Sequence, residues 1–341
     1  MTEPFLVIEN LVVQFPSPQG FLTVVDHVSL DVHRNEVVCL VGESGSGKSM
    51  TMQAAVGLVQ AKGGRVRSGS VRFDGRELVG MSTRQLNRIR GNEIGFIFQE
   101  PMSSLNPAYT VGEQIGEVVR RHRGASRKQA RARAVEMLDR VGIASAANRV
   151  DDYPHQFSGG MRQRVMMAIA LACEPKLLIA DEPTTALDVT VQARMLKLLK
   201  DLQRDMNMSV LFITHDLGVV AEIAERVVVM YAAQVVERAP SATLFRHPRH
   251  PYTSGLLEAM PQVALARNQP PSAIPGTVAQ AHAWPRGCRF HPRCGFTVPE
   301  LCAGEPVALH PHSDTLVRCS RSESVEPALL HLSAERKAQA A

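Results

Sequence analysis

Short apolar runs alternate with longer amphipathic segments over the first two thirds of the chain. The short runs are rich in Val, Ile, Leu and Phe, which is typical of β-strands; they are Phe5–Ile8, Leu11–Phe15, Thr23–Leu30, Glu36–Val41, Leu177–Ala180, Val210–Thr214 and Arg226–Tyr231. The longer segments have helical character; they are Ser49–Gln60, Val111–Arg121, Arg127–Val141 and Val189–Met206. This alternation predicts an α/β fold with a mainly parallel core sheet, antiparallel strands at the N-terminal end and a helical insertion at about residues 102–164.

The pattern changes at about residue 240. Prolines become frequent and long periodic segments disappear, while four of the six cysteines fall in the last sixth of the chain. We therefore predict one large domain over residues 1–240 and a small loop-rich C-terminal region over residues 241–341. No internal repeat is found at any period.

Composition and charge narrow the class of protein. Apolar residues make up 45% of the 341 residues, and the formal net charge is only +5. Such a mild bias gives no ground for a nucleic-acid partner, and the basic run Arg120–Arg133 is interpreted as a solvated helix face. Because no segment reaches the ~18 consecutive apolar residues of a membrane span, and the N-terminus does not resemble a signal peptide, we expect a cytosolic chain that meets a membrane only through a partner.

A glycine-rich loop follows the apolar run Glu36–Val41 and precedes a helical segment. Gly42–Ser49 matches G-x-x-x-x-G-K-[ST] in full. Small residues let backbone N–H groups surround a phosphate, the lysine adds positive charge near the β- and γ-phosphates, and the final serine can ligate Mg²⁺. Strand and helix flank the motif as a phosphate loop requires, which argues against a mere flexible turn. The expected nucleotide contacts are Gly42, Ser44, Gly45, Gly47, Lys48 and Ser49.

Two adjacent carboxylates end the apolar run Leu177–Ala180. Asp181 lies where a strand would end beside the phosphate loop, which suits a residue that holds Mg²⁺. Glu182 would then polarise the water that attacks the γ-phosphate. An acidic strand end is common on any surface, but together with the phosphate loop the pair predicts an ATPase.

The segment Phe157–Gln163 resembles the LSGGQ motif of ABC ATPases, with Phe157 for Leu and Met161 for Gln. It lies between the phosphate loop and the acidic pair, in the family's order. The resemblance implies a P-loop ABC cassette that works as a dimer, in which the Ser-Gly-Gly turn closes over ATP held by the opposite subunit. The turn consists of Ser158, Gly159 and Gly160.

The same resemblance implies roles for further residues. Gln99 falls at the family's Q-loop glutamine, which touches Mg²⁺, and His215 at its switch histidine, which contacts the γ-phosphate. Asp188 ends a segment that resembles the D-loop of the dimer interface. Phe15 is the candidate for stacking on adenine, and Phe21 competes for that role.

A finer resemblance, to ATP-binding subunits of oligopeptide and dipeptide importers, covers nearly the whole chain. It is carried by Val41–Ser49, Phe98–Pro107, Tyr153–Met161 and His250–Thr253. The closest pattern is that of the dipeptide permease D-type subunit. It implies a second, homologous ATPase subunit, two transmembrane permease subunits, an extracytoplasmic substrate-binding protein and a peripheral place on the cytoplasmic face of the membrane. Nickel and glutathione importers share these motifs, so the cargo stays open.

The clustered cysteines also match this subfamily; they are Cys288, Cys294, Cys302 and Cys319. Four thiolates can hold a [4Fe–4S] cluster or Zn²⁺. Some members of the subfamily carry the cluster, while free thiols are a third alternative. Three rival functions stay open: a soluble ABC ATPase without transport activity, a metal or redox sensor, and an exporter. The sequence lacks the second cassette, coiled coil or fused membrane span that the first and third often have.

Overall fold

The computed structural model describes residues 4–100, 104–185, 187–266, 268, 270 and 272–325. The chain forms two compact units. The first consists chiefly of Val32–Val37 and Gly80–Ile213, and the second of Phe5–Asp31, Val38–Val79 and the chain from Thr214 onward. Residues 102, 103 and 186, at the start of the predicted helical insertion and in the D-loop, lie outside the described residues, as do residues 326–341. The predicted division at residue 240 stays a prediction.

Three parallel strands form the sheet of the first unit: β6 (Ile94–Ile97), β7 (Leu177–Asp181) and β8 (Ser209–Thr214). β7 lies between the other two, with Ile94 opposite Leu177 and Leu177 opposite Ser209. All five residues of β7 are buried. This explains why its sequence is continuously apolar rather than alternating, and it brings the C-terminal ends of β6 and β7 to the same edge.

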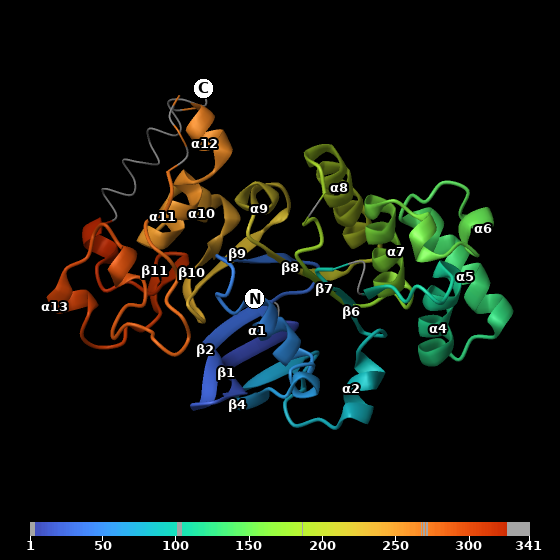
Figure 1. Cartoon of the computed structure of the whole chain (residues 1–341), viewed down its shortest axis with the longest axis horizontal. Coiled ribbons are helices and arrows are strands. Elements are labelled where there is room, and N and C mark those ends of the chain that lie inside the picture. Colours follow the sequence, from blue (N-terminus) through green and yellow to red (C-terminus); the bar gives the residue numbers. More distant parts are fainter. Residues whose placement is uncertain are drawn as a thin grey trace. The chain divides into compact units, whose positions relative to one another are not determined.

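Among its described residues, the first unit has the helices α2 (Thr83–Ile89), α4 (Val111–Arg123), α5 (Arg127–Arg140), α6 (Ala146–Arg149), α7 (Gly159–Leu171) and α8 (Val189–Asp205), with a 3₁₀ turn at Pro154–Gln156. α4, α5 and α7 pack together (Figure 1). Capping boxes at Thr110 and Ser126 start α4 and α5, and Gly124 in the left-handed region ends α4. The basic run from Arg120 is therefore divided between two helices, and most of its side chains are exposed, as predicted.

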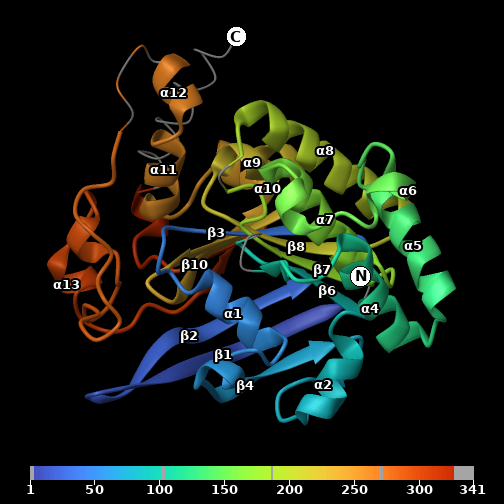
Figure 2. The same cartoon turned by 45° about the vertical axis from the view of Figure 1, so that its right-hand side comes forward.

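An antiparallel sheet opens the second unit. Its strands β1 (Leu6–Ser17), β2 (Gly20–Val32), β4 (Arg65–Phe73) and β5 (Arg76–Glu77) lie in the order β2-β1-β4-β5. β1 is one strand where the sequence predicted two, because its pairing with β4 continues past an irregularity near Asn10, which has a φ of 48°. Helix α1 (Lys48–Ala55) packs on this sheet, and the 3₁₀ turn Gln60–Lys62 follows it (Figure 2).

The second unit also contains a mixed sheet, ordered β11 (His310–His312), β12 (Thr315–Val317), β10 (Gln234–Pro240), β9 (Arg226–Tyr231) and β3 (Val37–Val41). β3 pairs with β9 in parallel, and the other pairs are antiparallel. The part of this unit that the structure describes also has the helices α9 (Leu217–Ile223), α10 (Ser241–Arg246), α11 (Pro251–Glu258), α12 (Pro261–Ala266) and α13 (Pro299–Cys302), with a 3₁₀ turn at His291–Arg293.

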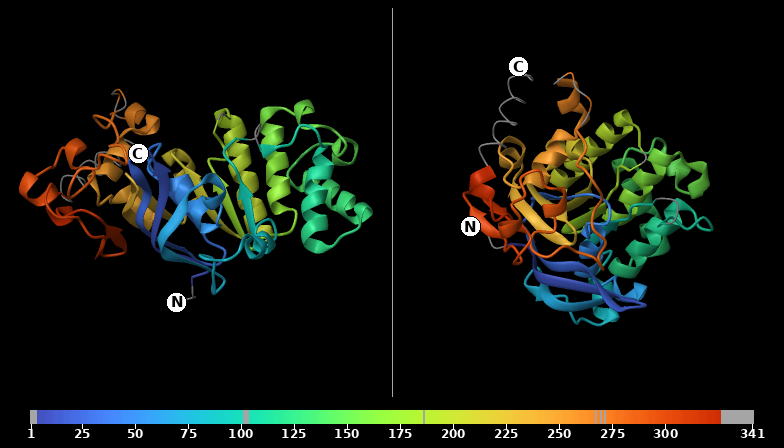
Figure 3. Two further views of the ribbon diagram at one scale, coloured as in Figure 1. Left: turned by 60° about the horizontal axis from the view of Figure 1, so that its bottom comes forward. Right: turned by 60° about the vertical axis from the view of Figure 1, so that its left-hand side comes forward.

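The C-terminal region shares this sheet. β12 pairs with β10, so residues far beyond position 240 belong to the same layer as the strands that precede it. The red C-terminal segment lies beside the orange helices α10 and α11 in the views of Figure 3. Among the described residues, none of the helices has the length and apolar character needed to cross a membrane.

Candidate active site

The phosphate loop joins β3 to α1 in the second unit. The Lys48 ammonium is almost fully buried and donates hydrogen bonds to two carbonyl oxygens of the loop, Gly42 O at 2.8 Å and Glu43 O at 3.0 Å. The loop backbone therefore wraps around the ammonium. This places a fixed positive charge and the N-terminus of α1 together, which is the arrangement that binds phosphate groups.

Two glycines of this loop leave no room for a side chain. A Cβ at Gly42, where φ is 149°, would lie 2.1 Å from the carbonyl oxygen of Met230. A Cβ at Gly47, where φ is 98°, would lie 2.7 Å from the carbonyl oxygen of Val24. Gly42 and Gly47 are thus required by both backbone conformation and close approach, since L-residues rarely adopt such φ values.

The acidic pair ends the central strand of the first unit. Asp181 is the last residue of β7 and is 3% exposed. Glu182 follows with a φ of 46°, and its N–H donates to Ile213 O at 3.0 Å. A left-handed φ is unusual for Glu and turns the chain sharply, so that the two neighbouring carboxylates lie in different environments.

Gln99 lies close to Glu182. The Gln99 Nε2 group donates to Glu182 Oε2 at 3.0 Å, and the Thr185 hydroxyl donates to the same oxygen at 3.1 Å. The structure thus brings together two residues that the sequence placed at one catalytic centre. The carboxylate is oriented by two donors, as a group that must position a water molecule needs to be.

The Ser-Gly-Gly turn forms the N-terminus of α7. Ser158 is the N-cap, and its hydroxyl accepts from the N–H of Met161 at 3.4 Å. Ser158 and Gly159 are exposed, while Phe157 is buried and anchors the turn. Because a helix N-terminus carries backbone N–H groups without an intrahelical partner, an exposed helix start of this kind suits an anion.

Asp188 has a local structural role. Its Oδ1 atom accepts from the N–H of Val191 at 2.9 Å, which makes it the N-cap of α8. The residue is exposed, so the cap remains accessible from outside this unit.

His215 and Phe15 belong to the second unit. His215 follows β8 and is exposed. The N–H of Asp216 donates to the Thr214 hydroxyl at 3.0 Å, which closes the turn around His215. Phe15 is half-buried, with its ring against the backbone of Gly64. Its competitor Phe21 is 52% exposed, and the Arg65 guanidinium lies 3.4 Å from its ring centroid. Both phenylalanines offer ring surface, so the choice between them stays a prediction.

All four clustered cysteines line one cavity of about 20 Å³, together with His250 and His291 among others. Burial raises the pKa of Cys288 and Cys294, and raises that of Cys319 to about 12. A metal would therefore displace protons when it binds. A cavity of this volume holds about one water molecule, and within the described ranges no three His, Cys, Asp or Glu side chains are arranged to hold an ion. The donor set suits a thiolate-bound metal, but the cavity would have to widen for a four-iron cluster.

Sequence reasoning missed the residues that support the phosphate loop from the C-terminal region. Arg293 forms an ion pair with Glu43 inside the loop, and the Tyr252 hydroxyl accepts from the N–H of Glu43 at 2.9 Å. The only signal was indirect: Glu43 is a charged residue at a variable position of the motif, and Arg293 adjoins Cys294.

Comparisons with known proteins agree with this geometry. The family model described as ABC transporter matches residues 25–185, and the model described as Oligopeptide/dipeptide transporter, C-terminal region, matches residues 236–302. The chain is 48% identical to a putative peptide import ATP-binding protein of Brucella abortus (strain 2308), over 95% of this chain and 98% of that protein. It is 49% identical to the oligopeptide transport ATP-binding protein AppD of Bacillus subtilis (strain 168), over 92% and 95%.

A solved structure is similar as well. A dimeric ATP-binding cassette in a post-hydrolysis state, bound to ADP and Pi, is 28% identical and has a TM-score of 0.62. The match covers 69% of this chain and 98% of that one.

Proposed function

The chain belongs to the family of ABC transporter ATP-binding subunits, and from this we propose that it powers a membrane importer of di- or oligopeptides. The observation that carries the proposal is the combination of a complete ATPase motif set with a C-terminal region of the oligopeptide/dipeptide transporter type. Relatives named for peptide import and oligopeptide transport match along nearly the full length.

We propose that ATP is held by the phosphate loop and hydrolysed at Glu182. Lys48 and the N-terminus of α1 bind the phosphate groups. The hydroxyl of Ser49 and the carboxylate of Asp181 are oxygen donors of the kind that suits Mg²⁺, which when bound neutralises charge on the phosphates. Glu182, oriented by Gln99, positions the attacking water, and His215 approaches the γ-phosphate.

Coupling to transport requires a second cassette. In the proposed head-to-tail pair, the exposed turn at Ser158 and Gly159 of one subunit closes over the nucleotide bound to the other, and Asp188 lies at the interface. Closure favoured by the γ-phosphate would be transmitted to two permease subunits at the cytoplasmic face of the membrane through the helical region near Gln99. A nucleotide can drive this change only through its higher affinity for the closed state.

We also propose that the four cysteines bind a metal centre, as a [4Fe–4S] cluster. This is supported by the four cysteines that line one cavity. That cavity would have to widen to take the cluster, and the centre would add thiolate–metal bonds that hold the C-terminal region together. Anaerobic purification followed by absorbance near 400 nm and by iron, sulfide and zinc analysis tests the proposal. Zinc without iron, or neither metal, would reject the cluster.

The import function is tested with the whole complex. The chain is purified with its permease partners and partner ATPase, reconstituted in lipid vesicles, and supplied with its substrate-binding protein. Peptide-loaded binding protein should stimulate ATP hydrolysis. It should also drive labelled peptide across the vesicle membrane, to the side opposite the binding protein. Stimulation by nickel or glutathione instead would assign the alternative cargo. Hydrolysis unaffected by any of these loads would contradict the importer function.

A further inference from the structure

Two arginines of the C-terminal region contact the phosphate loop or the turn between β9 and β10 that holds it. Arg289 and Arg293 both lie in the short segment between Cys288 and Cys294, and both are largely buried at their ion pairs. Neither is part of the phosphate-loop motif, the acidic pair or the Ser-Gly-Gly turn. Their partners show what the segment does.

Arg293 holds the one acidic side chain inside the phosphate loop. Its two terminal nitrogens donate to the two carboxylate oxygens of Glu43, at 2.7 Å and 3.1 Å. The Arg293 side chain is 7% exposed and that of Glu43 28%. This two-bond geometry fixes the direction of the carboxylate as well as neutralising it.

Arg293 is itself held in place. Its Nε group donates to Pro275 O at 2.7 Å, and its guanidinium carbon lies 5.7 Å from the centroid of the Tyr231 ring. The guanidinium is therefore pre-oriented, and it does not depend on Glu43 alone for its position.

Glu43 connects these contacts to the lysine of the loop. Its carbonyl oxygen accepts from Lys48 Nζ at 3.0 Å, while its N–H donates to the Tyr252 hydroxyl at 2.9 Å. Backbone and side chain of this one residue are thus fixed by the C-terminal region on one side and touch the phosphate-binding lysine on the other.

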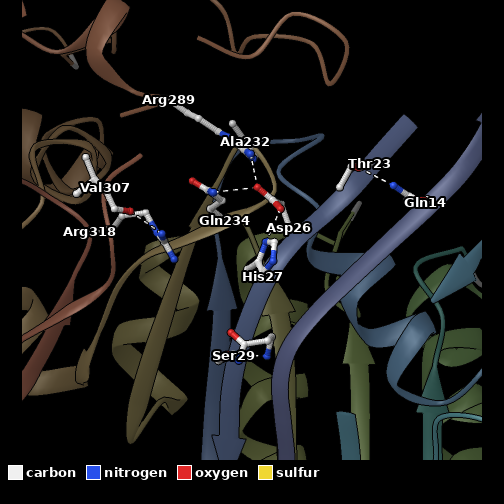
Figure 4. Close-up of polar contacts among 11 residues, drawn as sticks. Gln14, Thr23, Asp26, His27, Ser29, Ala232, Gln234, Arg289, Val307 and Arg318 are labelled. Atoms are coloured by element: carbon white, nitrogen blue, oxygen red, sulfur yellow. Dashed lines mark hydrogen bonds and ion pairs between the residues drawn. The ribbon is translucent and has the colours of Figure 1, made fainter. Parts of the chain in front are cut away.

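Arg289 supports the same loop by a second route (Figure 4). Its guanidinium donates to Ala232 O and forms an ion pair with Asp26, which also accepts from Gln234 Nε2 at 3.0 Å. These contacts fix the turn between β9 and β10.

That turn touches the loop directly. The N–H of Ala233 donates to Ser46 O at 3.0 Å, and Ala233 O accepts from the N–H of Asp26 at 2.9 Å. The loop is therefore supported at Glu43 through Arg293 and at Ser46 through Arg289.

Charge decides which contact matters most for nucleotide binding. An unpaired carboxylate in a loop that receives a triphosphate would repel the phosphate groups, and a partly buried site screens that repulsion little. We propose that Arg293 is a positioning residue for ATP binding: by neutralising and aiming Glu43, it sets the charge and shape of the phosphate loop. The proposal rests on ATP binding by this loop, and wild-type protein that failed to bind ATP would refute the function itself rather than this role.

The test compares variants of the full chain in its assembled complex. Arg293→Ala should raise the KM for ATP about tenfold, because a charged hydrogen-bonded pair is broken, while kcat changes less than about twofold. Binding of labelled ATP to the full chain should weaken by the same factor. Arg286→Ala, an exposed arginine close by in sequence, is the matched control and should leave both constants unchanged.

A double variant separates this role from simple tethering of the C-terminal region. Glu43→Gln combined with Arg293→Ala removes the unpaired charge and should bring the KM back to within about threefold of wild type. If Arg293 served only to tether the C-terminal region, changing Glu43 would not restore the KM for ATP. If Arg293→Ala does not fold, Arg293→Lys is compared with and without Glu43→Gln, because lysine keeps the charge but loses the two-bond geometry. An unchanged KM in the single variant, or no recovery in the double variant, would overturn the proposal.

Discussion

Gln99 and Glu182 are 83 residues apart in sequence, yet the side-chain amide of Gln99 donates a 3.0 Å hydrogen bond to the carboxylate of Glu182. The contact follows from the sheet of the first unit, because β6 and β7 are parallel neighbours whose C-terminal ends meet. The Thr185 hydroxyl donates to the same carboxylate oxygen. The residue that we propose as the relay to the permease subunits is therefore one contact away from the proposed catalytic base.

Replacing Glu182 by Gln should stop hydrolysis without preventing ATP binding. The amide keeps the size of the side chain but cannot accept a proton from water, so kcat should fall at least about a hundredfold. Phosphate release and binding of labelled ATP are the two measurements. Glu136→Gln, which changes an exposed carboxylate of α5, is the control. Turnover near the wild-type rate would remove Glu182 from its assigned role.

Replacing Lys48 by Ala should weaken ATP binding itself. The variant loses the ammonium that the loop carbonyls of Gly42 and Glu43 surround, and affinity should fall at least about tenfold. Titration of the full chain with labelled ATP measures the effect. Lys62→Ala serves as the control, since Lys62 follows α1 and bonds the Gln53 side chain instead. Equal losses in the two variants would show that a general loss of positive charge is responsible.

Replacing Gly42 by Ala should destabilise the fold as well as the site. The new Cβ would lie 2.1 Å from Met230 O, at a φ of 149°, so the free energy of unfolding should drop by about 3 kcal/mol or more. Gly75→Ala is the comparison, because its φ of 74° is also unfavourable but no atom lies within 4 Å of the added carbon; a loss of about 1 kcal/mol is expected there. Urea unfolding of both variants checks the difference, and similar losses would mean that strain at positive φ alone, without the contact to Met230, sets the effect.

Glu237 should make the stability of the protein depend on pH. Its buried carboxylate accepts from the N–H groups of Arg249 and His250, at 2.7 Å and 2.9 Å, and burial raises its pKa to about 7 from an ordinary value of 4.5. Between these pH values the folded chain keeps a proton that the unfolded chain has released. The stabilisation from this group is therefore fully present below pH 4.5 and is lost as pH rises to about 7.

The Glu237→Gln variant isolates that contribution. His250 acts in the opposite sense, because burial lowers its pKa to about 3, but it is present in both proteins and cancels in the comparison. The free energy of unfolding of the wild type minus that of the variant should fall by about 3 kcal/mol between pH 4.5 and pH 7. Urea unfolding at a series of pH values measures it, and a difference that does not change with pH would contradict the prediction.

The buried elements of the fold were predictable from the sequence. β7 and β8 are continuous apolar runs because both faces are covered, and α8 was predicted as Val189–Met206 against Val189–Asp205 observed. The phosphate loop was predictable because Gly42 and Gly47 stand where no side chain would fit. β4 was missed because most of its side chains are at least partly exposed, and it becomes a strand only by pairing with β1.

The support of the phosphate loop could not be predicted in this way. Glu43 and Arg293 are 250 residues apart, and nothing in either local sequence selects the other as its partner. The strands β10 and β12 were missed for a similar reason, since β12 has three residues and exists through its pairing with β10. Long-range pairing in a proline-rich region leaves little local periodicity to detect.

The pairing of β12 with β10 has a consequence for any shortened form of the chain. A protein that ended before Thr315 would leave the β10 backbone around Glu237 and Arg238 without the strand that covers it. Uncovered edge strands recruit other strands, including those of neighbouring copies. Truncation at this point would therefore expose a template for self-association, even though every ATPase motif of the sequence would still be intact.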